Sequence, residues 1–255
     1  MFGETEQIQY INADVVSRAT AQGFEVTENG TTWSHPGWRA YNKPLPLPLH
    51  TESGAPGLLE KAHAAGVKVM ASIGGWSMCK HFPEMAADPV KRQRFVDDCV
   101  RLINLGFDGI DLDWEYPGPF SGMNFTGTTA DFTNFAILIE EIRAAIGPDK
   151  LITAAMSAAP NKLQGFDWPR LNNTMNYFNM MTYDFNGGWS NIAGHNSPVH
   201  PYPGAEADFS WERTLETLNQ LGVPKNKINM GIPFYGRGVI CNGTANLNVD
   251  YCKTR

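Results

Sequence analysis

The chain has 255 residues, of which 42% are hydrophobic and 18% are charged, enough apolar material for one sizeable core and too much for a disordered tail. Its formal net charge of −6 disfavours nucleic acids and anionic membranes as partners, because both bind to a basic surface, and favours a neutral substrate. No apolar run approaches the roughly 18–20 residues of a membrane-spanning helix, and residues 1–6 lack the basic and apolar regions of a signal peptide.

Short β-rich runs alternate with helical patterns, and no internal repeat or low-complexity linker divides the chain. Strands are expected at residues 8–13, 67–73, 109–114, 151–157, 177–183 and 228–233. Helical patterns occupy residues 88–103, 132–142 and 214–221, and the first opens with a cap residue and a proline. We therefore expect one domain over residues 1–255, with an α/β fold built on a parallel sheet.

The order of the elements favours a (β/α)8 barrel of the TIM type, with a doubly wound sheet as the alternative. Only six convincing strands can be found, however. Residues 14–56 are rich in Gly, Pro, Asn and Thr and show no clear helical pattern. This segment is expected to form a long excursion that could contribute to a binding face.

The four cysteines are too scattered for a disulfide scaffold, and none lies in a CxxC pair, which disfavours a zinc site. Cys99 lies in a helical pattern and is expected to be a small buried hydrophobe, whereas Cys241 and Cys252 could close a short terminal loop. The histidines show no ligand spacing and no phosphate-binding loop is present, so neither a metal nor a cofactor is expected. Asn-x-Thr triplets, which are glycan acceptors in a eukaryotic secretory route or chance occurrences, begin at Asn29, Asn124, Asn172 and Asn242.

One predicted strand has an acidic face. Side chains alternate in a strand, so Asp111, Asp113 and Glu115 share one side at a spacing of roughly 6.5–7 Å. A parallel strand is normally buried on both faces, so these carboxylates would repel one another and lose hydration. We expect them to retain and share protons. Glu115, the outermost of the three, is the candidate general acid.

Two other readings of the acidic strand stay open. It could be an edge strand with a solvated face, although its apolar partners on the other face do not fit that arrangement. It could also hold magnesium or calcium with oxygen ligands from elsewhere in the chain. A transition metal is not indicated, because no histidine lies near these acids.

Four motifs together resemble glycoside hydrolase family 18, the family of chitinases and related enzymes. The acidic strand matches the DxxDxDxE signature at Asp108, Asp111, Asp113 and Glu115. Residues 72–76 (SIGGW), 181–184 (MTYD) and 230–237 (MGIPFYGR) resemble three further family segments in the same order. The tryptophan after the two glycines and the Trp-Glu-Tyr-Pro run resemble chitinases more than endo-acting N-glycan hydrolases.

The resemblance implies a role for each matching residue. Glu115 would protonate the glycosidic oxygen, Asp113 would hold and polarise the 2-acetamido group, and Asp111 would share the proton and charge of Asp113. Tyr183 would donate a hydrogen bond to the acetamido carbonyl. Ser72 would steady the inner aspartates, and sugars would be bound by Trp76, Met156, Asp184, Trp189, Tyr235 and Arg237.

The resemblance also implies a substrate-assisted reaction. An ordinary retaining glycosidase has a second carboxylate about 5 Å from the acid, across the scissile bond. Here all three acids come from one strand, so the acetamido oxygen would attack C1 and Asp113 would stabilise the oxazolinium cation. The implied protein is an extracellular hydrolase that acts on chitin or chito-oligosaccharides.

The sequence has fewer strands than the eight-stranded barrel of this family. If Glu115 follows the fourth strand, residues 8–13 would form the second strand, and the first would have no counterpart. The residues after Arg237 are too few for the family's inserted α+β subdomain and for an eighth strand with its site-floor tryptophan. We therefore expect a truncated barrel of about six βα units, incomplete at both ends, whose unpaired edges could self-associate.

Truncation leaves a second function open. A chitin-binding, lectin-like protein that has lost activity with the floor of its site is the alternative to a chitinase. A peptidoglycan or N-glycan hydrolase is a third reading, and the sequence does not separate these sugars.

Overall fold

The computed structural model describes residues 57–76, 78–122, 125–190, 193–206 and 208–241, with residue 51 and short strands at 25–26, 33–34 and 252–254. The strand predicted at residues 8–13 lies outside these ranges, as does most of the excursion predicted at 14–56. Three of the four Asn-x-Thr triplets, those that begin at Asn29, Asn124 and Asn242, also start outside them.

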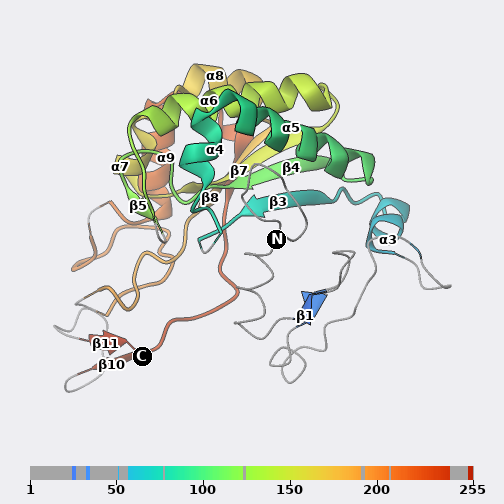
Figure 1. Ribbon diagram of the computed structural model, residues 1–255. Helices are drawn as coiled ribbons and strands as arrows, with labels where there is room; N and C mark the ends of the chain where they lie inside the picture. The colour runs from blue at the N-terminus through green and yellow to red at the C-terminus, as the bar shows by residue number, and fades with distance from the viewer. Residues whose placement is uncertain are drawn as a thin grey trace.

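A parallel sheet of five strands forms the centre of the described chain (Figure 1). In spatial order its strands are β3 (Met70–Gly74), β4 (Gly109–Asp113), β7 (Leu151–Ser157), β8 (Tyr177–Met181) and β9 (Ile228–Met230). This order follows the sequence, as expected when each strand returns through a helix to its neighbour. The five predicted strands within the described ranges are therefore confirmed, although β4, β8 and β9 end earlier than predicted and β3 begins three residues later.

The remaining strands form three antiparallel pairs: β1 (Glu25–Val26) with β2 (Trp33–Ser34), β5 (Ser121–Gly122) with β6 (Phe125–Thr126), and β10 (Val239–Cys241) with β11 (Cys252–Thr254). The backbone register of the last pair sets Cys241 opposite Cys252. This register fits the loop closure predicted from the sequence, and a bond between the two cysteines stays a prediction.

Figure 1 shows the longer helices gathered on one face of the sheet. The helices are α3 (Leu58–Ala64), α4 (Phe82–Ala87), α5 (Pro89–Asn104), α6 (Ala130–Ile146), α7 (Pro160–Leu163), α8 (Trp168–Thr174) and α9 (Trp211–Gln220). The three predicted helices correspond to α5, α6 and α9. The other four were not predicted, because each spans seven residues or fewer and is too short to show a helical period.

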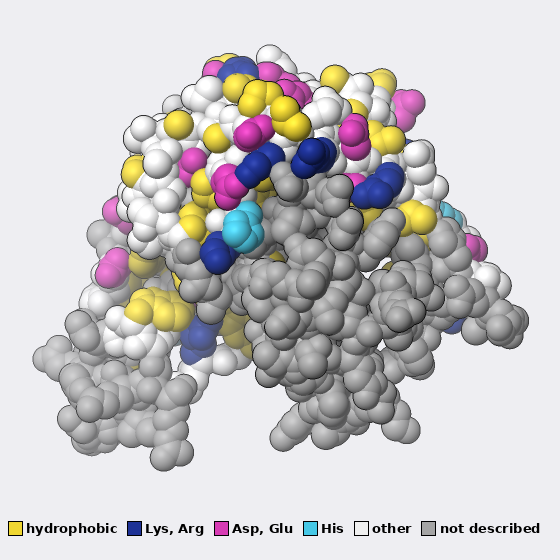
Figure 2. All heavy atoms as spheres, viewed as in Figure 1, with side chains coloured by type: hydrophobic (Ala, Val, Ile, Leu, Met, Phe, Trp, Pro, Cys, Tyr) yellow, Lys and Arg dark blue, Asp and Glu magenta, His cyan; other side chains and the backbone are white. Residues whose placement is uncertain are grey.

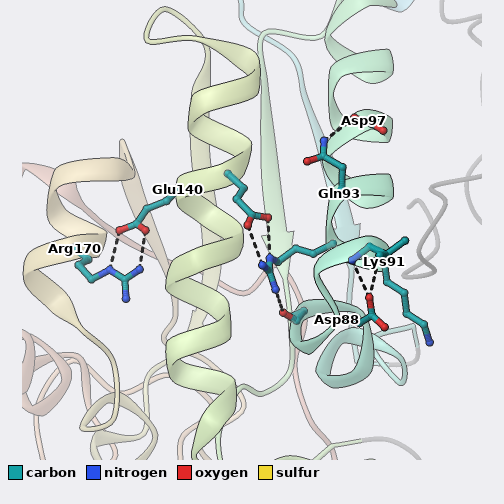
Figure 3. A network of polar contacts seen from close by, with 10 residues as sticks. Asp88, Lys91, Gln93, Asp97, Glu140 and Arg170 are labelled. Atoms are coloured by element: carbon teal, nitrogen blue, oxygen red, sulfur yellow. Dashed lines mark hydrogen bonds and ion pairs between the residues drawn. The ribbon is translucent and has the colours of Figure 1, made fainter.

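Caps and ion pairs hold the helical layer in place (Figure 3). The side chain of Asp88 accepts hydrogen bonds from the first backbone N–H groups of α5, as the sequence predicted. Arg92 of α5 forms a bidentate pair with Glu141 of α6, and Arg170 of α8 forms another with Glu140 of α6. Acidic and basic side chains are interspersed over this face in Figure 2.

The hydrophobic core lies between the helices and the sheet. Trp114 stacks on Phe82 with ring centroids 5.3 Å apart, and the Phe135 ring is tilted against Trp114 with centroids 6.2 Å apart. Cys99 is fully buried in α5, so the prediction of a small buried hydrophobe is confirmed. The amide Nδ2 of Asn172, within one Asn-x-Thr triplet, donates to a backbone carbonyl of the turn after α9 at 3.0 Å.

Candidate active site

The predicted acidic residues lie at the carboxyl end of the sheet. Asp111 and Asp113 belong to β4, and Glu115 follows two residues after the strand ends. The apolar side chains that alternate with them are buried against the helices. The two faces of β4 thus separate polar groups from the core, as the two-residue period predicted.

Side chains from three other strands donate hydrogen bonds to Asp111. Ser72 Oγ lies 2.7 Å from Oδ2, Asn179 Nδ2 lies 3.1 Å from Oδ1, and Thr153 Oγ1 also donates to Oδ1. The amide of Asn179 is itself oriented, because its Oδ1 accepts from Asn229 Nδ2 at 2.9 Å. Ser72 was predicted to contact the aspartates of the acidic strand, whereas Thr153 and Asn179 were not predicted. The sequence distinguishes these two residues only as polar positions within apolar strands.

Asp113 is desolvated and incompletely paired. Its Oδ1 atom is buried and has no hydrogen-bond partner among the described residues. Burial raises the pKa of Asp113 to about 7, and the charges of Glu115 and Asp111 act in the same direction. The direction agrees with the proton retention predicted for acids that share one face of a buried strand.

Gly74, at the end of β3, permits the close approach of the two strands. Its φ of +107° is one that residues with a side chain rarely adopt, and a Cβ atom there would lie 2.3 Å from the backbone oxygen of Asp113. The next residue, Gly75, donates its N–H to the same oxygen at 2.7 Å. The two glycines of the SIGGW motif therefore hold the backbone of Asp113.

Glu115 lies beside Tyr116 and the loop that follows β3. Burial raises the pKa of Glu115, whereas hydrogen bonds from the Tyr116 hydroxyl and the Trp76 backbone N–H, and the charge of Lys162, act to lower it. The ammonium group of Lys162 lies 3.7 Å from the centre of the Tyr116 ring. Because the net shift is upward, Glu115 is suited to hold a proton for donation. Sequence reasoning assigned no site role to Tyr116 or Lys162.

The residues that follow β8 and β9 form a second polar group. Arg237 Nε and Nη2 each lie 2.6 Å from Oδ1 of Asp184. Although burial acts to raise it, hydrogen bonds from Arg237 and Tyr235 hold the pKa of Asp184 below its ordinary value. The Arg237 guanidinium lies 4.9 Å from the centre of the Trp189 ring, and Tyr183 packs edge-on against Tyr235. The structure thus brings these five predicted residues together.

Tyr183 connects this group to the acidic strand. Burial raises the pKa of its hydroxyl, and the charges of Asp113 and Glu115 raise it further, so the hydroxyl stays a hydrogen-bond donor at neutral pH. The indoles of Trp76 and Trp189 are 47% and 61% exposed. Exposed indoles of this kind can pack against the C–H faces of sugars, which is the placement that the sequence predicted.

Met156 lies in the hydrophobic core, which differs from the position that the resemblance implied. It was expected to line the sugar site, but it is 4% exposed and belongs to the hydrophobic core. Strand β7 pairs with β4 so that Thr153 lies opposite Asp111, and Met156, three residues later, is on the other face. Met181 pairs with Ser157 and is the methionine that shares the acidic face.

The described ranges hold no group of three or more His, Cys, Asp or Glu side chains that could bind a metal ion. No helix within them combines the length and the apolar character needed to cross a membrane. The partners that the structure assigns to Asp111 are the hydroxyl and amide groups described above.

Comparison with known proteins identifies relatives of this chain. The sequence model of Glycosyl hydrolases family 18 matches residues 7–253. A probable endochitinase of Caenorhabditis elegans is 36% identical over 71% of this chain and 30% of its own length. The solved chitinase ChiA74 from Bacillus thuringiensis superimposes with a TM-score of 0.71 at 29% identity, over 88% of this chain and 39% of that one.

A further solved relative contains a bound sugar. A mutant of Ostrinia furnacalis group II chitinase catalytic domain 2, in complex with (NAG)5, has a TM-score of 0.70 at 29% identity, over 75% of this chain and 52% of that chain. The chain therefore spans about a third to a half of the length of these relatives. The chitinase neighbours confirm the TIM-barrel fold class. The absence of the first and eighth strands stays a prediction, because the chain ends lie largely outside the described residues.

Proposed function

This chain belongs to glycosyl hydrolases family 18, and on that premise we propose that it is a chitinase that cleaves β-1,4-linked N-acetylglucosamine polymers with retention of configuration. The observation that carries the proposal is the state of Asp113 and Glu115. Both carboxyl groups have raised pKa values, and the buried Oδ1 of Asp113 has no hydrogen-bond partner among the described residues. Glu115 can thus donate a proton, and Oδ1 of Asp113 can accept a hydrogen bond from the substrate.

In the first step the substrate supplies the nucleophile. The acetamido oxygen attacks C1 while Glu115 gives its proton to the glycosidic oxygen, which leaves with the electron pair of the broken bond. Oδ1 of Asp113 accepts a hydrogen bond from the acetamido N–H, and its charge stabilises the oxazolinium cation that forms. The Tyr183 hydroxyl donates to the acetamido oxygen and fixes its direction of attack.

In the second step water opens the oxazolinium ring. The Glu115 carboxylate takes a proton from the water as the oxygen bonds to C1, and the ring electrons return to the acetamido group. Two inversions at C1 leave its configuration unchanged. Asp111, held by Ser72, Thr153 and Asn179, shares the proton and charge of Asp113 through both steps.

The remaining residues of the site would bind the sugar chain. Asp184, Tyr235 and Arg237 would contact the sugar whose C1 reacts, because they lie beside Tyr183. Trp76 and Trp189 would stack on the sugars of the leaving group, because their indoles are exposed. The (NAG)5 bound to the Ostrinia furnacalis relative supports chito-oligosaccharides as the ligand class.

The proposal includes an extracellular location, chitin binding and one catalytic domain over residues 1–255. Self-association is also part of the proposal. Among the described residues, β3 and β9 are the two edge strands of the five-stranded sheet, and a sheet edge that stays unpaired can join to another strand. A lectin-like protein is the weaker alternative, because the acid position is occupied by glutamate.

Turnover of chitotetraose by the wild type and by Glu115→Gln tests the proposal. We expect the substitution to lower kcat by about 10²–10⁴-fold, the usual contribution of general acid catalysis, while the dissociation constant for the sugar changes little. Glu206→Gln, which removes an exposed carboxylate, is the matched control and should retain full activity. Binding without turnover by the wild type would favour the lectin, and equal cleavage of deacetylated chitosan would contradict the substrate-assisted mechanism.

A further inference from the structure

The loop between β3 and α4 approaches Glu115 at two points. The backbone N–H of Trp76 is close enough to the carboxylate of Glu115 to act to lower its pKa. Three residues later, Cys79 is completely buried, with its Sγ atom 3.4 Å from the backbone N and 3.4 Å from the backbone O of Glu115. One loop therefore contacts both the side chain and the main chain of the candidate acid.

The backbone of Glu115 needs such a partner because it lies beyond the sheet. The last residue pair between β3 and β4 is Gly74 with Asp113, and the last pair between β4 and β7 is Leu112 with Ala154. Buried N–H and C=O groups that have left a strand ladder must find other partners. A thiol can serve both groups, because its sulfur is a weak acceptor and its S–H a weak donor.

We infer that Cys79 is a positioning residue for the general acid: its thiol accepts the N–H and donates to the C=O of Glu115 and so fixes where the carboxyl group stands. The inference rests on the proposed function, since it concerns the acid of that reaction. A misplacement of an acid by even 1 Å can cost a large factor in rate. The thiol would act through the main chain of Glu115 and has no contact with substrate in this mechanism.

Cys99 provides a matched control. Cys99 is equally buried and packs in the core from α5. Within the described part of the chain, no hydrogen bond joins it to the acidic strand, in contrast to Cys79. A cysteine that acts only as a small hydrophobe should behave as Cys99 does. Substitutions of the two residues therefore remove similar volumes from the core, and only those at residue 79 alter the backbone of Glu115.

The test compares two substrates on each protein sample. Chitotetraose has a sugar leaving group that needs the proton of the acid, whereas the 4-methylumbelliferyl chitobioside has a phenolate leaving group that needs it less. Because both rates come from the same sample, their ratio is independent of how much protein is folded. The samples are the wild type, Cys79→Ala, Cys79→Ser, Cys99→Ala and Cys99→Ser.

We expect Cys79→Ala to lower kcat on chitotetraose by about 10–100-fold, part of the general acid contribution, and to lower it on the 4-methylumbelliferyl substrate by less than about 5-fold. Cys79→Ser should restore most of the ratio, because a hydroxyl can also accept and donate. Both Cys99 variants should keep the wild-type ratio.

An unchanged ratio in Cys79→Ala would overturn the role of Cys79, whether the two rates fall together or stay the same. A Cys79→Ser variant with the same ratio as Cys79→Ala would overturn the hydrogen-bonding explanation. A wild type that cleaves neither substrate would instead overturn the proposed function, and the role of Cys79 with it.

Discussion

Replacement of Asp113 by asparagine should stabilise the protein at neutral and alkaline pH. Burial and the neighbouring carboxylates raise the pKa of Asp113 from 3.8 to about 7 in the folded state. Between these values the folded protein holds a proton that the unfolded chain has released. The stability contributed by this proton is complete below the unfolded pKa and is lost as pH rises through the folded pKa. Asparagine has the same shape but cannot ionise, so it avoids this loss.

The magnitude follows from the shift. One pKa unit corresponds to about 1.4 kcal/mol, so the two units between pH 5 and pH 7 should cost the wild type roughly 3 kcal/mol of unfolding free energy. Little further loss is expected above pH 7, where Asp113 is ionised in both states. The gain from Asp113→Asn should therefore be roughly 3 kcal/mol larger at pH 8 than at pH 5.

Urea unfolding at pH 5 and at pH 8 measures this difference for the wild type and for the variant. Asp149→Asn, which removes an exposed carboxylate, controls for the loss of one charge and should show a similar effect at both pH values. A pH-dependent difference of less than about 1 kcal/mol for Asp113→Asn, or one of opposite sign, would refute the explanation of the raised pKa by burial. Activity should be lost in this variant at both pH values.

Three further substitutions test other parts of the structure. Gly74→Ala places a Cβ atom 2.3 Å from the backbone oxygen of Asp113, so kcat on chitotetraose should fall by about 10²-fold through displacement of the site. Lys162→Met removes a charge that lowers the pKa of Glu115, so the alkaline limb of the kcat/KM profile should move to higher pH. Arg143 donates to three backbone carbonyls and one side-chain amide, so Arg143→Met should lower the unfolding free energy by about 3 kcal/mol with kcat unchanged.

Each of these expectations has a contrary result. Full activity of Gly74→Ala would mean that the strand ends can separate without harm to the site. An alkaline limb that moves to lower pH in Lys162→Met would mean that Lys162 does not stabilise the ionised form of Glu115. A loss of less than about 1 kcal/mol in Arg143→Met would mean that water replaces the guanidinium at these carbonyls.

Much of the fold and of the acidic site could be read from local pattern. The alternation that sets Asp111, Asp113 and Glu115 on one face is a property of any extended backbone, so it needed no knowledge of neighbouring strands. The direction of the pKa shifts followed from the same pattern, because acids that share a buried face are desolvated and repel one another. Strand and helix order predicted the barrel class, although helices of seven residues or fewer gave no periodic signal.

The tertiary structure decided which residues from distant parts of the chain join that face. Thr153 and Asn179 reach Asp111 only because parallel pairing sets their strands in one register, and the same register turns Met156 into the core. Cys79 contacts Glu115 only because a loop 36 residues earlier folds over the end of β4. Periodicity along one strand is a local property of the backbone, whereas the phase of one strand relative to the next is set by packing between segments far apart in sequence.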